Sequence, residues 1–220
     1  MTRVIFVSAT GTDIGKTYVT CLLLRQLHAQ GYSARAIKPV ISGFDENALE
    51  DSDSGLLLSA MGEAPTLNNV RNISPWRFAA PLPPHLIALQ TGTPLKFDEI
   101  VSFCRRKTDK NLDFLLIEGA GGIMTPLTYE HTMLDLISQL DCACLLVCGS
   151  SLGTLSHSHT AINCLKQQDV ETCGIIISES AESYADFQIV TDDFSKIFPN
   201  ISIRNIRRHD TTEDLCSLIT

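Results

Sequence analysis

The 220-residue chain lacks the long hydrophobic and basic stretches that mark membrane and nucleic-acid-binding proteins. No apolar run is long enough to cross a bilayer, and the first residues resemble a core strand more than a signal peptide. The densest basic group is Arg204, Arg207 and Arg208, which does not offset a net charge of −8. We therefore expect a cytoplasmic protein that binds neither nucleic acid nor an anionic membrane surface.

The chain also lacks a Cys-x-x-Cys pair, although it contains 8 cysteines. Cys142, Cys144 and Cys148 lie in an apolar, strand-like run, and their even spacing predicts that all three share one face. Buried free thiols behave as small hydrophobic side chains, and a cytosolic chain keeps them reduced. His157 and His159 face different directions on a predicted helix and make a poor ligand pair. We expect neither a disulfide framework nor a soft-metal site.

Apolar strands alternate with helical patterns along the chain, of which 44% is hydrophobic. Strands are predicted at 4–7, 34–39, 112–118, 142–148, 172–178 and 201–206. Helices are predicted at 16–30, 52–62, 96–107, 131–140, 154–168 and 183–196. Such alternation is typical of a parallel sheet flanked by helices on both faces. The sequence therefore predicts one α/β domain over residues 1–220, with Gly31 ending the first helix.

A phosphate-binding loop follows the first predicted strand. Residues 8–17 read Ser-Ala-Thr-Gly-Thr-Asp-Ile-Gly-Lys-Thr and lead into the first helix. Backbone N–H groups of such a turn, with the helix N-terminus, bind phosphate oxygens. Lys16 can reach the β- and γ-phosphates, and the Thr17 hydroxyl can ligate Mg²⁺. The loop departs from the strict G-x-x-x-x-G-K-[ST] pattern, because Thr10 stands in place of the first glycine and Gly11 follows it. The alternative is a structural turn with an exposed lysine.

Polar residues follow other predicted strands, and ligands of parallel sheets bind beyond the carboxyl ends of the strands. Lys38 ends the second strand, and it is either a solvated terminus or held over the phosphate loop. Asp53 lies in Asp-Ser-Asp-Ser, which could equally be an ordinary helix cap. Glu118 leaves a buried strand into Gly-Ala-Gly-Gly. A carboxylate in that position suits Mg²⁺, which prefers oxygen ligands.

Taken together, these segments resemble the dethiobiotin synthetases. The matching motifs, in chain order, are Gly11–Thr17, Lys38–Gly43, Asp53, Phe78–His85, Glu118–Gly122 and Leu152–His157. The resemblance implies a P-loop NTPase-like α/β fold, a homodimer, Mg²⁺, and ATP as co-substrate. Members of this family join CO₂ to 7,8-diaminononanoate. One amine is carbamoylated, the carbamate takes the γ-phosphoryl group, and the second amine closes a ureido ring with loss of phosphate.

The same resemblance implies roles for individual residues. Lys16 would act on the β- and γ-phosphates and the carbamate, and Lys38 would be the active-site lysine that stabilises the carbamate and the transferring phosphoryl group. Ser42 would contact the diamine end of the substrate. The turn at Gly153 and Thr154 would receive the substrate carboxylate from the neighbouring subunit, at a helix N-terminus.

The resemblance also implies a metal site and a nucleotide site. Thr17, Asp53 and Glu118 would hold Mg²⁺. The residues expected to bind the nucleotide are Thr12, Asp13, Ile14, Gly15, Lys16, Thr17, Tyr18, Asp53, Glu118, Gly119, Ala120, Gly121, Ser178 and Glu179.

The chain departs from the family pattern in three places. Gly11 stands where the family usually has Asp, after a loop that begins at Ala9. Ser178-Glu179 replaces Asn-Asp, and Arg207-Arg208 replaces a usual Pro near the base. A hydroxyl makes fewer directed hydrogen bonds than a carboxamide, so these changes leave the base preference open.

Two other readings of the phosphate loop are weaker. A partition or septum-positioning ATPase would carry a signature lysine early in the loop, where this chain has Gly11. An amidotransferase-type ligase of the cobyrinate class would need an added glutaminase domain, for which 220 residues leave no room. The septum-type switch is the alternative that we keep beside the synthetase.

Overall fold

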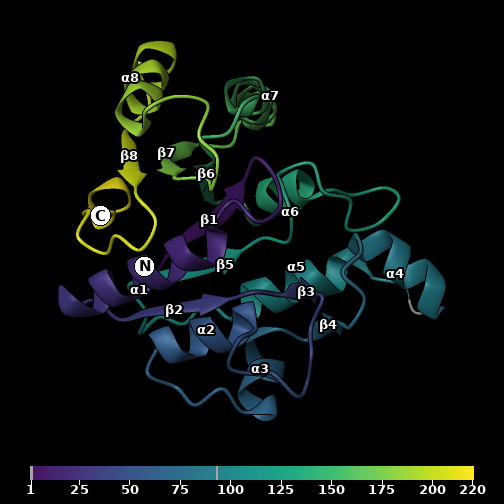
Figure 1. Ribbon diagram of the computed structural model, residues 1–220. Coiled ribbons are helices and arrows are strands. Elements are labelled where there is room, and N and C mark those ends of the chain that lie inside the picture. Colours follow the sequence, from purple (N-terminus) through teal and green to yellow (C-terminus); the bar gives the residue numbers. More distant parts are fainter. Residues whose placement is uncertain (1, 93) are drawn as a thin grey trace.

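A parallel six-stranded sheet forms the centre of the computed structural model, which describes residues 2–92 and 94–220 (Figure 1). Its strands lie in the order β2 (Ala34–Ile37), β5 (Phe114–Glu118), β1 (Arg3–Ala9), β6 (Ala143–Cys148), β7 (Thr172–Ser178) and β8 (Ile203–Ile206). Every pairing within this sheet is parallel. The predicted fold class is therefore confirmed.

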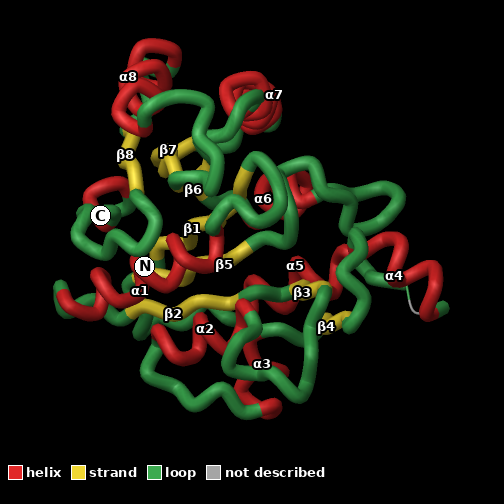
Figure 2. Tube along the Cα trace, viewed as in Figure 1, coloured by secondary structure: helices red, strands yellow, loops and turns green. Residues whose placement is uncertain are grey.

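Helices cover both faces of the sheet (Figures 1 and 2). They are α1 (Lys16–Ala29), α2 (Asp53–Ala60), α3 (Leu67–Ile73), α4 (Pro84–Thr91), α5 (Phe97–Arg106), α6 (Met133–Leu140), α7 (Thr154–Gln167), α8 (Phe187–Ile197) and the short 3₁₀ turn η1 (Cys216–Leu218). Helix α1 packs with η1 on one face, α5, α6 and α7 lie on the other, and α2 and α3 lie beyond β2. This division follows from right-handed crossovers that run in opposite directions along the sheet, from β1 to β2 through α1 and from β5 to β6 and β7 through α6 and α7.

The end of α1 shows how local sequence positions the first layer. Val19, Leu23 and Leu27 are completely buried against the sheet. Gly31 adopts a φ of 87°, and the N–H of Tyr32 donates to the carbonyl of Leu27 at 3.0 Å. A left-handed glycine with this hydrogen bond is a Schellman ending. The prediction that Gly31 ends the helix is confirmed.

The register of the sheet aligns the carboxyl ends of its strands. Val7 lies opposite Glu118 across the β1–β5 pair, and Ser178 lies opposite Ile206 across the β7–β8 pair. Residues that follow these strands therefore meet at one edge, although they are far apart in the sequence.

The cysteine prediction is correct except at one position. All 8 cysteines are free. Cys144 and Cys148 lie buried in β6, and burial raises the pKa of the Cys148 thiol to about 12. Cys142 lies outside the strand, because Asp141 ends α6 in a left-handed conformation with φ 52°. The shared face therefore holds within the strand for Cys144 and Cys148, and Cys142 lies one residue before it.

Several short elements were not predicted from the sequence. They are α3, α4, η1 and a two-stranded parallel pair formed by β3 (Val40–Ser42) and β4 (Trp76–Phe78). The chain enters this pair directly after β2, and Ser42, at the end of β3, lies near the phosphate loop. Within the described ranges, every helix is too short or too polar to cross a bilayer.

Candidate active site

The phosphate loop between β1 and α1 has the geometry of an anion site. Asp13 has a φ of 56° and Gly15 a φ of 101°, both in the left-handed region. Within the described part of the chain, no side chain caps the start of α1, so its first N–H groups are free to meet an anion. Lys16 Nζ donates to the Gly11 carbonyl at 3.1 Å, and burial, with the charge of Lys38, lowers the pKa of Lys16 to about 8.

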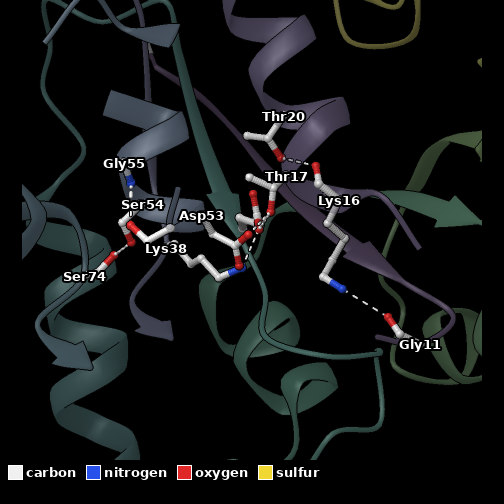
Figure 3. A network of polar contacts seen from close by, with 11 residues as sticks. Gly11, Lys16, Thr17, Thr20, Lys38, Asp53, Ser54, Gly55 and Ser74 are labelled. Carbon is white, nitrogen blue, oxygen red and sulfur yellow. Dashed lines mark hydrogen bonds and ion pairs between the residues drawn. The ribbon is translucent and has the colours of Figure 1, made fainter. Parts of the chain in front are cut away.

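Four side chains meet beside this loop, at the carboxyl ends of β2 and β5 (Figure 3). Thr17 Oγ1 lies 2.9 Å from Asp53 Oδ1 and 2.7 Å from Glu118 Oε1. Lys38 Nζ donates to Asp53 Oδ2 at 2.5 Å and to Glu118 Oε1 at 2.6 Å. Asp53 is the first residue of α2, whose N-cap Ser52 accepts from the Gly55 N–H at 3.0 Å.

The charges of this cluster are strongly coupled, and two of its four residues are buried. Lys38 is 5% exposed and Glu118 1% exposed. Burial alone would lower the pKa of Lys38, but the carboxylates of Glu118 and Asp53 outweigh it and raise that pKa above its usual value. Burial would likewise raise the pKa of Asp53, but the Lys38 ammonium holds it below the usual value. Lys38 is therefore cationic and Asp53 anionic at neutral pH.

The oxygen atoms of this cluster fit a hard divalent cation. Thr17, Asp53 and Glu118 bring a hydroxyl and two carboxylates into contact, which is the type of ligand set that Mg²⁺ accepts. Glu118 Oε2 is buried and has no hydrogen-bond partner among the described residues. A buried carboxylate oxygen without a partner is costly unless a ligand satisfies it.

A cavity of about 370 Å³ opens over the cluster and the loop. It is lined by Thr12, Asp13, Gly15, Lys16, Thr17, Tyr18, Lys38, Ser42, Asp53, Ala120 and Gly121. A second cavity of about 370 Å³ adjoins it and is lined by Asp13, Ile14, Gly15, Tyr18, Ser178, Glu179, Ser180, Ala181, Ile206, Arg207, Arg208 and His209. Both cavities include Asp13, Gly15 and Tyr18, so together they form an elongated site that spans the phosphate loop.

The glycine-rich turn after β5 has to approach the phosphate loop closely. Gly121 has a φ of 66°, and a Cβ there would lie 2.3 Å from Thr125 Oγ1. A Cβ on Gly122 would lie 3.2 Å from Gly11 Cα. These contacts give the glycines a structural reason to be present. Ala120 and Gly121 line the first cavity, whereas Gly119 packs against Phe6.

Comparison with known proteins places this chain in a family. A family model described as an AAA domain matches residues 3–218. A protein of Caulobacter vibrioides named ATP-dependent dethiobiotin synthetase is 43% identical over 180 residues, which cover 81% of each chain. Proteins with the same name from Phenylobacterium zucineum and Francisella tularensis are 42% and 32% identical, covering 82% and 84% of this chain and 77% and 84% of their own. The chain belongs to the dethiobiotin synthetase family.

Solved structures of other proteins share only the fold with this dethiobiotin synthetase family member. The cell division protein FtsY of Thermotoga maritima superposes with a TM-score of 0.56 at 16% identity, over 96% of this chain and 63% of its own. The septum site-determining protein MinD of Pyrococcus horikoshii, complexed with MgADP, gives 0.52 at 20% identity, over 87% and 77%. At such low sequence identity, structural similarity shows a shared fold and gives no information about activity.

The second cavity contains residues that the sequence did not single out. Ser180 follows β7, and His209 follows β8. Their positions just past the ends of strands were the sequence signal that could have identified them as site residues. Neither residue belongs to a motif that the dethiobiotin synthetase resemblance covers. Glu179 Oε2 accepts from the Arg208 N–H at 2.9 Å, and the Tyr18 hydroxyl donates to the Asp210 carbonyl at 2.5 Å. These contacts hold the loop after β8 against the end of β7 and the first turn of α1.

The predicted substrate-carboxylate turn lies apart from both cavities within one chain. Gly153 has a φ of 93° and precedes α7. Thr154 is buried, and its hydroxyl donates to the Gly149 carbonyl at 2.7 Å. The neighbouring Leu152 is 88% exposed. A role for this turn in dethiobiotin synthetase chemistry would therefore have to be exerted on another chain, and it stays a prediction.

Proposed function

We propose that the protein is an ATP-dependent dethiobiotin synthetase that acts on 7,8-diaminononanoate and CO₂. Relatives named for this activity align with about four-fifths of the chain. The observation that carries the proposal is the hydrogen-bonded cluster of Thr17, Lys38, Asp53 and Glu118 beside an anion-binding loop. This arrangement suits a phosphoryl transfer, in which catalysis consists mainly of positioning and charge stabilisation.

The nucleotide is expected to span the two adjoining cavities. Its phosphates would lie on the N–H groups between Thr12 and Thr17, with Lys16 turned from the Gly11 carbonyl toward the β- and γ-phosphates. The base would enter the second cavity, beside Ser178 and Glu179. The nucleotide-binding roles predicted for Tyr18, Asp53, Glu118, Gly119, Ala120 and Gly121 remain part of this proposal.

The reaction that we propose has three steps. One amine of the substrate attacks the carbon of CO₂ and loses a proton, which gives a carbamate. A carbamate oxygen then attacks the γ-phosphorus, and ADP leaves. The second amine attacks the carbamate carbon, loses a proton and expels inorganic phosphate, which closes the ureido ring.

The side chains of the first cavity stabilise the charge that develops in these steps. The ammonium groups of Lys16 and Lys38 face anionic oxygens of the carbamate and of the transferring phosphoryl group. Thr17, Asp53 and Glu118 would hold Mg²⁺, which supplies charge neutralisation at the phosphates when bound. Ser42 lines the same cavity and is placed to contact the diamine.

The proposal extends to the assembly and its compartment. A homodimer would bring the turn at Gly153 and Thr154 to the substrate carboxylate of the other subunit, where a helix N-terminus favours an anion. The 8 free cysteines suit a reducing compartment, for which we propose the cytoplasm.

The direct test is product formation. The purified protein is mixed with MgATP, bicarbonate and 7,8-diaminononanoate, and dethiobiotin is sought by mass spectrometry. We expect dethiobiotin in the wild type, loss of turnover in Lys38→Ala with nucleotide binding retained, and unchanged turnover in Lys166→Ala, which removes an exposed lysine of α7. Absence of dethiobiotin in the wild type, or full turnover in Lys38→Ala, would refute the proposed function.

A further inference from the structure

The two lysines of the first cavity have different partners. Figure 3 shows Lys16 directed toward the Gly11 carbonyl, whereas Lys38 is directed toward the carboxylates. Both carboxylates that contact Lys38 also contact Thr17, so one group of oxygen atoms serves a hydroxyl and an ammonium at once. Two of the three N–H donors of Lys38 are thereby held by carboxylates, which keeps the ammonium on the carboxylate side of the cavity.

A divalent cation would need the oxygen atoms that Lys38 now contacts. Magnesium binds carboxylate oxygens at about 2.1 Å. Because Lys38 Nζ lies 2.6 Å from Glu118 Oε1, a cation on that oxygen would lie within about 5 Å of the ammonium. Lys38 and Glu118 are buried and the Asp53 side chain is 41% exposed, so repulsion at this place is screened less than in bulk water. The lysine and the cation therefore exclude each other from these carboxylates.

The lysine has another place to go. Lys38 and Lys16 line the same cavity of about 370 Å³, and Ser42 lies on its wall. Lys38 lies between β2 and β3, where its N–H donates to the Ile73 carbonyl at 3.1 Å, and its side chain already lines the cavity, so a change of side-chain rotamer alone can turn the ammonium into it. Glu118 Oε2, which is buried without a partner in the described structure, offers the incoming cation an additional ligand atom.

We propose that Lys38 is an internal competitor of the metal, and that binding of a divalent cation to Thr17, Asp53 and Glu118 transfers the Lys38 ammonium into the phosphate cavity. The inference rests on the proposed function for the use of the metal. It couples two events, because the lysine reaches the phosphoryl group only when the metal has been loaded. Metal binding without nucleotide is correspondingly weak.

Direct metal binding tests this competition without ATP or the diamine. Mn²⁺ is titrated into the nucleotide-free protein, and the free ion is measured by electron paramagnetic resonance. Lys38→Met should bind Mn²⁺ roughly tenfold or more tightly than the wild type, because a buried repulsion has been removed. Lys16→Met is the matched control, since it removes an equal charge from the same cavity without touching the carboxylates. Its affinity should change by much less.

A second measurement uses the wild type and does not depend on whether Lys38→Met folds. Lysine ammonium signals are recorded by ¹⁵N-resolved NMR before and after saturation with Mg²⁺ alone, and Lys38 is assigned in the wild type by its broadening with Mn²⁺. The Lys38 signal should shift on saturation. Equal Mn²⁺ affinity in the wild type and Lys38→Met, or an unshifted Lys38 signal at saturation, would overturn the competition. Neither result would change the outcome expected in the dethiobiotin assay. A failure of the competition proposal can therefore be distinguished from a failure of the proposed function.

Discussion

Replacing Gly15 by alanine tests whether the phosphate loop requires a glycine where it passes Ser178. Gly15 has a φ of 101°, and a Cβ there would lie 2.7 Å from Ser178 Oγ. Gly31 has a similar φ of 87°, but a Cβ there would meet no described atom within 4 Å. Gly31→Ala is therefore a matched control that introduces the backbone strain without the steric contact.

The two substitutions differ in magnitude for this reason. A left-handed conformation costs an L-residue about 1–2 kcal/mol, which is the expected loss of unfolding free energy in Gly31→Ala. Overpacking against Ser178 adds about 1–3 kcal/mol in Gly15→Ala, so that its loss is about 2–5 kcal/mol. Ser178→Ala removes the Oγ atom, so the double variant should recover part of the overpacking cost.

Urea unfolding and nucleotide titration measure both consequences. ATP affinity should fall about tenfold for each 1.4 kcal/mol of distortion at the loop in Gly15→Ala, and it should be unchanged in Gly31→Ala. The reasoning is refuted if Gly15→Ala is no less stable than Gly31→Ala and binds ATP normally. It is also refuted if Ser178→Ala restores nothing.

Three further predictions concern the metal, the subunit interface and the thiols. Glu118→Gln should raise the Mg²⁺ concentration needed for half-maximal activity, and EDTA should abolish activity; activity that survives full chelation contradicts the metal site. Gly153→Val should weaken binding of the diamine and leave MgATP binding unchanged. Mixing Gly153→Val subunits with Lys38→Ala subunits should restore some activity, because one of the two sites in a mixed dimer is intact. A monomer by light scattering at assay concentration would contradict the shared site. Burial raises the pKa of Cys104 and Cys148 to about 12, so at about pH 8 only about one thiol in ten thousand is ionised. Both should resist a thiol reagent until the protein unfolds, and rapid labelling of the folded protein would show that they are accessible.

Local patterns in the sequence determined the elements that belong to the main sheet. Apolar strands and amphipathic helices carry their own periodicity, so each predicted strand and helix of the sheet layer has a counterpart within a few residues. The end of α1 was predictable because Gly31 alone supplies the required left-handed conformation. The phosphate loop was predictable because its chemistry lies within ten consecutive residues.

Short elements escaped the sequence patterns for a physical reason. Strands β3 and β4 have 3 residues each and pair with each other from positions far apart in the chain. A run of three residues has no measurable period, and its strand conformation comes from its partner. Helix α3, of 7 residues, has the same difficulty, and α4 begins within a proline-rich segment that contains Pro81, Pro83 and Pro84.

The composition of the active site was visible in the sequence, but its geometry was decided by the tertiary structure. Thr17 lies 36 positions from Asp53 and 101 from Glu118, and only the strand order brings them together. The sequence placed Lys38 at a strand end and left its partner open. Packing decided this, because the buried ammonium pairs with the two nearest carboxylates in the fold, wherever they lie in the chain.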